Sequence, residues 1–450
     1  MSVKITYDAD SRMLLEGLEC DCPCAHSLPN QDIYVGKNLI ERLPRYIEKR
    51  GLGRHCVVVC DGNTYRVAGQ KVYKTLKNAG FDAILLKFER NEELVPDETT
   101  IGELLLTIQP ETEFLVAVGS GSITDTCRVN AARCHLPFVS VGTAASMDGY
   151  TSVVAPLILH GVKIHRAGPC PEIILCDLDV LATAPIEMVR SGVGDVLGKY
   201  IAIADWQIGN IINDEPYCYT CGEIVLDAVG KLLANIPDIL ARTEKGMKIL
   251  IEGLLLAGIT IMIVGHTRAV ASVEHNIAHY VEMRMLEKYG KAPSHGATVG
   301  VGTLMVYPFF KRFATEDISD VDIDALRPID PQTRRAFVLE AYGKTAGETI
   351  LEENPGDFLS VEELHRRAQR AKDRYQEIKA VIDGMPAYEE IVRGMKELGA
   401  PMKLSELGVD RSIEEMSMRC AKDYRTRYTL FKTLDELGML ERYLADYRVE

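Results

Sequence analysis

Five short apolar segments occur in the first 180 residues of this 450-residue chain, and helical patterns lie between them. The segments are Cys56–Cys60, Ala83–Phe88, Phe114–Val118, Phe138–Val141 and Ile173–Cys176. Strands that are buried on both faces of a parallel sheet have this composition, because neither face meets water. Helical segments such as Ala68–Ala79 and Thr124–Arg133 separate them. We therefore expect an α/β domain with a doubly wound parallel sheet.

The pattern changes after about Pro185, where long segments carry apolar residues at helical spacing. These segments are Ile249–Val264, Val270–Tyr289, Val361–Ile382 and Ile413–Leu437. We predict an α/β domain at residues 1–185 and an all-helical domain at residues 186–450.

Charge and composition exclude several classes of protein. The formal net charge is −14 and no basic face is evident, so we expect no nucleic-acid partner. The N-terminus lacks an apolar signal region, and the longest apolar run, Gly253–Val264, is too short to cross a bilayer. We expect a cytoplasmic protein without membrane insertion, whose 12 cysteines are reduced.

The segment CDCPCAH concentrates Cys20, Cys22, Cys24 and His26. Its spacing is tighter than that of usual zinc ligands, and alternate residues of an extended strand point to opposite sides. This argues against a shared metal ion. Cys218 and Cys221 form a CxxC pair that we interpret as buried helix residues.

A glycine-rich turn follows the third predicted strand, in the string VAVGSGSITD. Glycines allow a pyrophosphate to approach the backbone, and the start of a helix supplies free N–H groups and a positive dipole end. We expect the helix to begin near Ile123, with Ser122 as its cap and Asp125 in its first turn. Thr124 breaks the dinucleotide fingerprint, so a plain strand-to-helix turn is the alternative.

Two further loops carry candidate cofactor ligands. Asp61 follows the first predicted strand, where a carboxylate can bind ribose hydroxyls, although a helix or turn cap is the alternative. The string SVGTAASMDGYTS supplies Thr143, Ser146 and Ser152 as donors to a cofactor and Asp148 as an acceptor from a substrate hydroxyl. A local turn network is the alternative for these residues.

Three distant segments suggest one metal site. His275 and His279 lie four apart on a predicted helix and share a face. His295 follows at a predicted helix start, and Asp195 stands four residues before Lys199 on another helix. Two imidazoles and one carboxylate, with a coordination position left open, form a recurring catalytic set for zinc and ferrous iron. Single helical histidines are also common as structural residues.

The strings GSGSITDTCR, TAASMDGYTS, SGVGDVLGK, EHNIAHY and SHGATVGVG occur in this order. Together they resemble the glycerol-1-phosphate dehydrogenase branch of the dehydroquinate synthase-like, iron-containing alcohol dehydrogenase superfamily. The resemblance extends from about Asp32 to the C-terminus. It differs at Ser120, where that branch often has a third glycine.

The resemblance implies an α/β nucleotide-binding domain, a helical metal domain and a homodimer. It implies reduction of a phosphorylated triose, dihydroxyacetone phosphate, to sn-glycerol 1-phosphate with NADH or NADPH and one divalent metal ion, zinc foremost, with nickel or iron as the other options. The implied pyrophosphate ligands are Gly121, Ser122, Ile123, Thr124 and Asp125, and the other nucleotide contacts are Thr143, Ser146 and Ser152. The implied metal ligands are Asp195, His275 and His295, and the implied substrate contacts are Asp148, Asp195 and His279.

Three alternatives remain. One is a polyol or glycerol dehydrogenase acting on non-phosphorylated substrates. Another is a sugar-phosphate cyclase like dehydroquinate synthase, which Asp195 disfavours because those enzymes resemble one another in having glutamate there. The third is a regulator that binds nucleotide and metal without turnover. Lys163 and Lys199 are candidates for the substrate phosphate.

Overall fold

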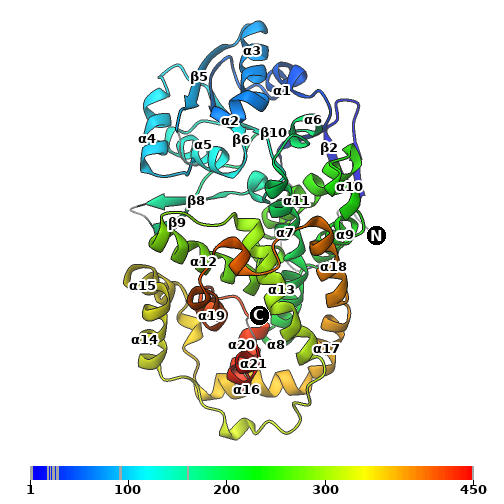
Figure 1. Cartoon of the computed structure of the whole chain (residues 1–450), viewed down its shortest axis with the longest axis vertical. Coiled ribbons are helices and arrows are strands. Elements are labelled where there is room, and N and C mark those ends of the chain that lie inside the picture. The colour runs from blue at the N-terminus through cyan, green and yellow to red at the C-terminus, as the bar shows by residue number, and fades with distance from the viewer. Residues whose placement is uncertain are drawn as a thin grey trace. The chain divides into compact units, whose positions relative to one another are not determined.

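The computed structural model describes residues 4–17, 20, 22, 26, 30–90, 94–159 and 162–447. It divides into two compact units that are interleaved along the chain. Figure 1 labels the helices and strands along the chain. Unit 1 comprises Met1–Cys20, Ala25–Val196 and Glu223–His266, and unit 2 comprises Asp21–Cys24, Leu197–Gly222 and Thr267–Glu450. The predicted domain division after residue 185 stays a prediction.

A six-stranded sheet forms the centre of unit 1, with strand order β3-β10-β7-β6-β4-β5. All its pairings are parallel. Its strands are β3 (Asp32–Gly36), β4 (His55–Asp61), β5 (Asp82–Phe88), β6 (Phe114–Gly119), β7 (Phe138–Gly142) and β10 (Ile173–Asp177). Two antiparallel hairpins accompany it, β1 (Lys4–Tyr7) with β2 (Met13–Glu16) and β8 (Val154–Leu159) with β9 (Val162–Ala167).

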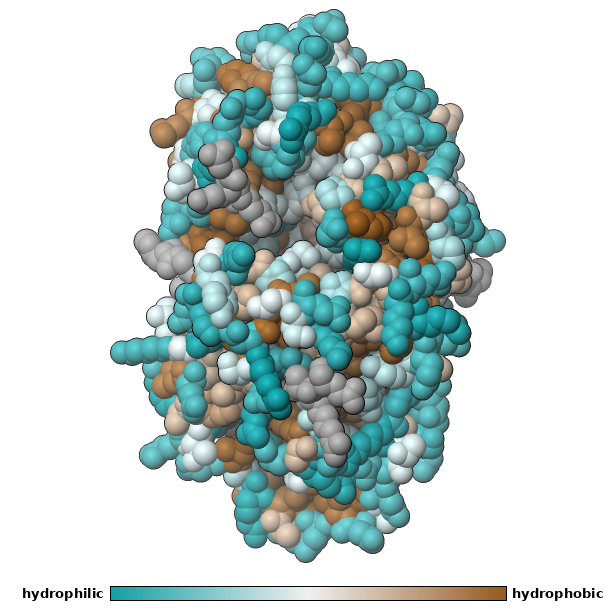
Figure 2. All heavy atoms as spheres, viewed as in Figure 1, coloured by the Kyte–Doolittle hydropathy of each residue, from teal (hydrophilic) through white to brown (hydrophobic). Residues whose placement is uncertain are grey.

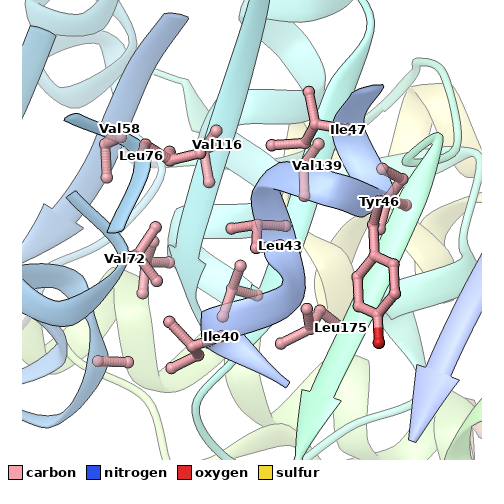
Figure 3. Close-up of a cluster of buried hydrophobic side chains, with 14 of the residues drawn as sticks. Ile40, Leu43, Tyr46, Ile47, Val58, Val72, Leu76, Val116, Val139 and Leu175 are labelled. Atoms are coloured by element: carbon pink, nitrogen blue, oxygen red, sulfur yellow. The ribbon is translucent and has the colours of Figure 1, made fainter. Parts of the chain in front are cut away.

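Both faces of this sheet are buried, and β4 shows how. Val58 packs in one apolar cluster, with Leu43 and Ile47 of the first helix and Leu76 of the third. Figure 3 shows these side chains together with residues of β6, β7 and β10. Val57 and Val59 pack in a second cluster, with residues of the fourth and fifth helices. Side chains that alternate along the strand therefore each meet a helical layer, which explains the continuous apolar runs.

The expected fold class is confirmed, since all five predicted strands occur in the parallel sheet. The sequence analysis missed β3 at the sheet edge and the β8–β9 hairpin, whose Pro156 is atypical of a strand interior.

The helices lying wholly or mostly in unit 1 are α1 (Leu43–Arg50), α2 (Gly62–Thr64), α3 (Gln70–Asn78), α4 (Glu98–Thr107), α5 (Gly121–Cys134), α6 (Leu178–Leu181), α7 (Ile186–Leu197), α9 (Tyr219–Leu233), α10 (Ile236–Leu240) and α11 (Glu244–Val264). In the part of the chain that the structure describes, only α11 is long and apolar enough to span a membrane, and 67% of its most apolar window is buried. Gly258 explains part of this burial, because a Cβ there would meet the side chain of Thr151. This packing agrees with the expected buried helix.

In its described part, unit 2 consists of helices and the loops between them, without a strand. Its helices are α8 (Lys199–Asn213), α12 (Val273–Tyr289), α13 (His295–Phe313), α14 (Pro331–Tyr342), α15 (Lys344–Glu353), α16 (Val361–Asp373), α17 (Tyr375–Asp383), α18 (Tyr388–Leu398), α19 (Arg411–Cys420), α20 (Leu430–Glu436) and α21 (Leu440–Asp446).

Two of the predicted long helices are each broken into two. Arg374 leaves helical geometry between α16 and α17 while its guanidinium donates to the carbonyl of Ile211, 2.8 Å away. After α19, the Cys420 and Ala421 carbonyls accept from Tyr342 and Asn276. Tertiary hydrogen bonds of this kind can replace helical ones, and residue spacing does not reveal them.

Hydrophilic residues make up most of the visible surface, and apolar residues are scattered among them (Figure 2). This agrees with a charged fraction of 26%.

Candidate active site

The sheet of unit 1 has a switch point between β4 and β6. From β4 the chain crosses to β5 on one side, and from β6 it crosses to β7 on the other. Crossovers that leave in opposite directions open a crevice beyond the carboxyl ends of the two strands, where α/β folds bind their ligands. Asp61 ends β4, and the Gly119–Gly121 turn follows β6. Both predicted nucleotide loops therefore flank this crevice.

The turn after β6 is held by close packing at Gly119. A Cβ at this position would lie 2.5 Å from the Cβ of Ile123, so only glycine lets α5 begin so near the strand. The helix begins at Gly121, earlier than expected, and its N-cap residue is Ser120. The prediction that Ser122 caps the helix was therefore wrong. The first turn leaves its N–H groups available to an anion, as a pyrophosphate site requires.

Polar contacts join this turn to the loop after β7. The hydroxyl oxygens of Ser120 and Ser146 lie 2.7 Å apart. Tyr150 donates to the carbonyl of Ala144 at 2.7 Å, and burial raises the pKa of its phenol, so it remains a donor. The backbone N–H of Thr143 donates to the carbonyl of Gly119 at 3.1 Å. Hydrogen bonds therefore join the turn after β6 directly to the loop after β7.

Asp125 faces Arg128 rather than the open end of the helix. Its carboxylate lies 2.8 Å from the Arg128 guanidinium, which also donates to the carbonyls of Gly149, Val154 and Pro169. Asp125 is the fifth helical residue, outside the first turn where we expected it. Burial raises its pKa to about 7 despite the neighbouring cation. This pair ties α5 to the following loop.

Other predicted cofactor ligands have local structural roles. Asp61 caps α2, accepting from the N–H of Thr64 at 2.7 Å in a capping box. The hydroxyl of Ser152 donates to the Val154 carbonyl and accepts from the Val154 N–H, both at 2.9 Å. Thr124 is buried, with its hydroxyl 3.5 Å from that of Ser140. Their roles toward a cofactor stay predictions.

The loop after β7 also contacts α7. The backbone N–H of Asp148 donates to Oδ2 of Asp195 at 3.0 Å. The Ser191 hydroxyl donates to the Ser146 carbonyl at 3.0 Å, and a Cβ on Gly192 would lie 2.0 Å from the Ala145 carbonyl oxygen. One face of α7 therefore lies directly on this loop, which positions the buried Asp195 carboxylate beside the Asp148 backbone.

Three histidines come together within unit 2. His275 and His279 are one turn apart on α12, and His295 is the first residue of α13. The His275 ring lies 5.3 Å from the His295 ring, and the His279 ring stacks on that of His295 at 5.1 Å. Ligand atoms of His275 and His295 lie within 4.8 Å of one another, close enough to share an ion. The prediction that His275 and His279 share a helix and that His295 begins another agrees with the structure.

Two buried carboxylates orient these rings. Nδ1 of His275 lies 2.6 Å from Glu274, and Nδ1 of His295 lies 2.6 Å from Glu282. A carboxylate on Nδ1 favours the proton at that nitrogen and leaves Nε2 with a lone pair for a metal. Metal-ligating histidines commonly have such a partner.

A second donor set exists in unit 2, formed by His279, Glu282 and His295. Glu282 is already engaged with Nδ1 of His295 at hydrogen-bonding distance, and its other oxygen lies 3.7 Å from Nδ1 of His279. This contact fits an orienting carboxylate better than a ligand.

Sequence reasoning missed Glu274, Glu282 and Tyr424, whose ring lies 5.4 Å from that of His279. It also missed Arg128. The spacing of Glu282, three residues beyond His279 on one helical face, was the one available signal. Of the two candidate phosphate ligands, Lys163 lies on β9, and Lys199 is buried at the start of α8.

The architecture is that of the iron-containing alcohol dehydrogenases. The crystal structure of glycerol dehydrogenase from Schizosaccharomyces pombe matches with a TM-score of 0.59 at 17% identity, over 95% of this chain and 93% of that one. Residues 34–185 match the family model for iron-containing alcohol dehydrogenases.

Comparison with curated relatives identifies the family within this class. Glycerol-1-phosphate dehydrogenase [NAD(P)+] of Halalkalibacterium halodurans is 33% identical over 93% of this chain and 96% of the relative. The enzyme of the same name from Bacillus subtilis is 34% identical over 76% and 89%. The chain belongs to the glycerol-1-phosphate dehydrogenase family, and the resemblance read from the sequence is confirmed. Membership of this family makes the chain an oxidoreductase.

Proposed function

We propose that this protein reduces dihydroxyacetone phosphate to sn-glycerol 1-phosphate with NADH or NADPH. The observation that carries the proposal is the 33% identity to a glycerol-1-phosphate dehydrogenase [NAD(P)+] over 96% of its length. A relation at this level along the whole chain includes both the nucleotide loops and the histidine helices.

We propose that the nucleotide lies against the switch-point crevice, with its pyrophosphate on the first turn of α5. The proposed ligands are Gly121, Ser122, Ile123, Thr124 and Asp125, supplemented by Thr143, Ser146, Ser152 and Asp61. The close approach of β6 to α5 at Gly119 supports this, because it aims free backbone N–H groups along the helix axis.

Asp195, His275 and His295 are the proposed ligands of one divalent ion, zinc foremost, with nickel or iron as the other options. The residues fit such an ion. Both imidazoles have a carboxylate on Nδ1, which leaves Nε2 as donor, and the Asp195 carboxylate is buried. When bound, the ion would supply Lewis-acid polarisation of a carbonyl.

His279 and Asp148 are the proposed substrate contacts. Reduction of a ketone leaves an oxygen that must take up one proton, and an imidazole titrates in the right range to deliver it. His279 stacks on His295 and lies near Glu282, which would hold its ring in place. Asp148 would accept from the substrate hydroxyl, and its backbone already contacts Asp195.

The test is NADH and NADPH oxidation with dihydroxyacetone phosphate, run separately with zinc, nickel and ferrous iron, followed by chiral analysis of the product. We expect sn-glycerol 1-phosphate and much slower turnover of dihydroxyacetone. Preference for dihydroxyacetone would favour a polyol dehydrogenase, and turnover without net cofactor consumption would favour a cyclase. Nucleotide and metal binding without turnover of any triose or polyol would favour the regulator.

A cytoplasmic location, a homodimer and the absence of nucleic-acid or membrane partners accompany this proposal. The acidic composition supports the absence of a nucleic-acid partner. Cell fractionation and light scattering on the purified protein test the location and the oligomeric state.

A further inference from the structure

The loop that precedes α20, residues 424–429, lies along the start of α12, and both belong to unit 2. Just before this loop, the carbonyl of Ala421 accepts from the side-chain amide of Asn276 at 2.8 Å. Within it, the Tyr424 ring lies 5.4 Å from the ring of His279. The α20 loop is therefore packed against the helix that carries two of the three clustered histidines.

Three arginine side chains gather at the α20 loop. The guanidinium of Arg425 lies over the ring of Tyr424, 4.9 Å from its centroid. The guanidinium of Arg427 donates to the carbonyl of Ala271, which lies just before α12. Arg268 donates to a carbonyl of the same loop at 2.8 Å. These contacts place three positive charges beside the histidine helix.

Two of these charges are not balanced by a carboxylate in contact. Among the residues that the structure describes, no carboxylate lies within ion-pair distance of Arg425 or Arg427, whereas Arg268 pairs with Glu215. Burial lowers the pKa of Arg427 to about 9, and the neighbouring Arg425 and Arg268 lower it further than Glu274 can offset. An anion bound at this loop would relieve the repulsion between the guanidinium groups.

The α20 loop is close enough to the histidines to bind the far end of a small substrate. A single aromatic ring, that of Tyr424, lies between the Arg425 guanidinium and His279. In dihydroxyacetone phosphate only one carbon and one oxygen atom separate the carbonyl carbon from the phosphorus atom. The groups that bind phosphate must therefore lie near those that bind the carbonyl. A guanidinium suits this role, because its planar N–H donors bind two phosphate oxygens at once.

We propose that Arg425 and Arg427 bind the phosphate group of the substrate and thereby make the site selective for a phosphorylated triose. This inference rests on the proposed function, since it names the residues that recognise its substrate. Both arginines are partly exposed, whereas the sequence candidate Lys199 is 1% exposed and less accessible to an incoming phosphate. Arg268 is not included, because Glu215 already balances its charge.

The experiment compares kcat/KM for dihydroxyacetone phosphate with kcat/KM for dihydroxyacetone, using the metal-loaded full chain. We expect the ratio of the two values to fall about 10- to 100-fold in Arg425→Gln and in Arg427→Gln, because each loses a charge-assisted hydrogen bond to phosphate. Arg419→Gln is the matched control, since this arginine of unit 2 is 53% exposed and lies 3.7 Å from Glu441. The control should keep the wild-type ratio, and a wild-type ratio in Arg425→Gln would overturn the proposal.

Inorganic phosphate provides a second measurement if Arg427→Gln does not fold. As a fragment of the substrate it should compete with dihydroxyacetone phosphate. Its inhibition constant should rise about tenfold or more in Arg425→Gln, whose native side chain makes no hydrogen bond within the described residues. An unchanged inhibition constant would also overturn the proposal. Wild type that does not reduce dihydroxyacetone phosphate would refute the proposed function itself, whereas normal reduction by wild type and both variants would refute only the role of the arginines.

Discussion

Glu282→Gln is the sharpest perturbation of the proposed catalytic metal site, because it changes one charge and almost no volume. The wild-type carboxylate is 3% exposed and lies 2.6 Å from Nδ1 of His295. Loss of a partner of this kind weakens metal binding by about 10- to 100-fold, or about 1.4 to 2.7 kcal/mol. We therefore expect Glu282→Gln to bind zinc that much more weakly, with most activity restored at saturating zinc.

The measurement is a zinc titration of the metal-depleted enzyme against a competing chelator, followed by activity at each zinc concentration. Glu287→Gln is the matched control, since it lies on the same helix with a side chain 65% exposed and paired with Arg284. That control should leave zinc affinity unchanged. Equal zinc affinities of Glu282→Gln and wild type would refute the orienting role of this carboxylate.

The same titration separates the two possible donor sets. If Glu282 were itself a ligand, together with His279 and His295, Glu282→Gln would fail to recover activity even at saturating zinc. In that case Asp195→Asn would leave zinc affinity unchanged. Under our proposal Asp195→Asn removes a ligand and costs more affinity than Glu282→Gln.

Three further predictions concern unit 1. Gly119→Ala places a Cβ 2.5 Å from that of Ile123, so we expect urea unfolding to show a loss of stability of about 1 to 3 kcal/mol. Steady-state kinetics of the same variant should show a raised KM for the nucleotide, and an unchanged KM would contradict the role of this turn. Asp61→Asn should keep the α2 cap and raise the preference for NADPH over NADH, and an unchanged preference would exclude a ribose contact. Asp61→Ala should also lower the stability by about 1 kcal/mol, because it removes the cap. Burial raises the pKa of Asp125 from its ordinary value near 4 to about 7, so the stability linked to its protonated form is fully present below about pH 4 and is lost as the pH rises from there through about 7. Asp125→Asn should flatten the pH dependence of the thermal midpoint between about pH 4 and about pH 7, and an unaltered slope would contradict this.

The strands of the sheet were predictable because burial on both faces leaves a strong mark. Residues 57–59 of β4 are all valine, and none of them meets water. The edge strand β3 has a weaker mark, since it is short and begins with an aspartate that pairs with Arg12. Helix ends in unit 2 were less predictable, because the breaks near Arg374 and Ala421 are stabilised by hydrogen bonds to distant residues.

The residues of the candidate site also differ in how far the sequence could predict them. His275, His279 and His295 could be found from the sequence, because helical spacing and a helix start set their relation locally. Glu282 could not be ranked above the other acidic residues of a chain with 65 of them, since only the fold shows which carboxylate meets a ring nitrogen. The orienting partners of a metal site are therefore harder to predict than its ligands.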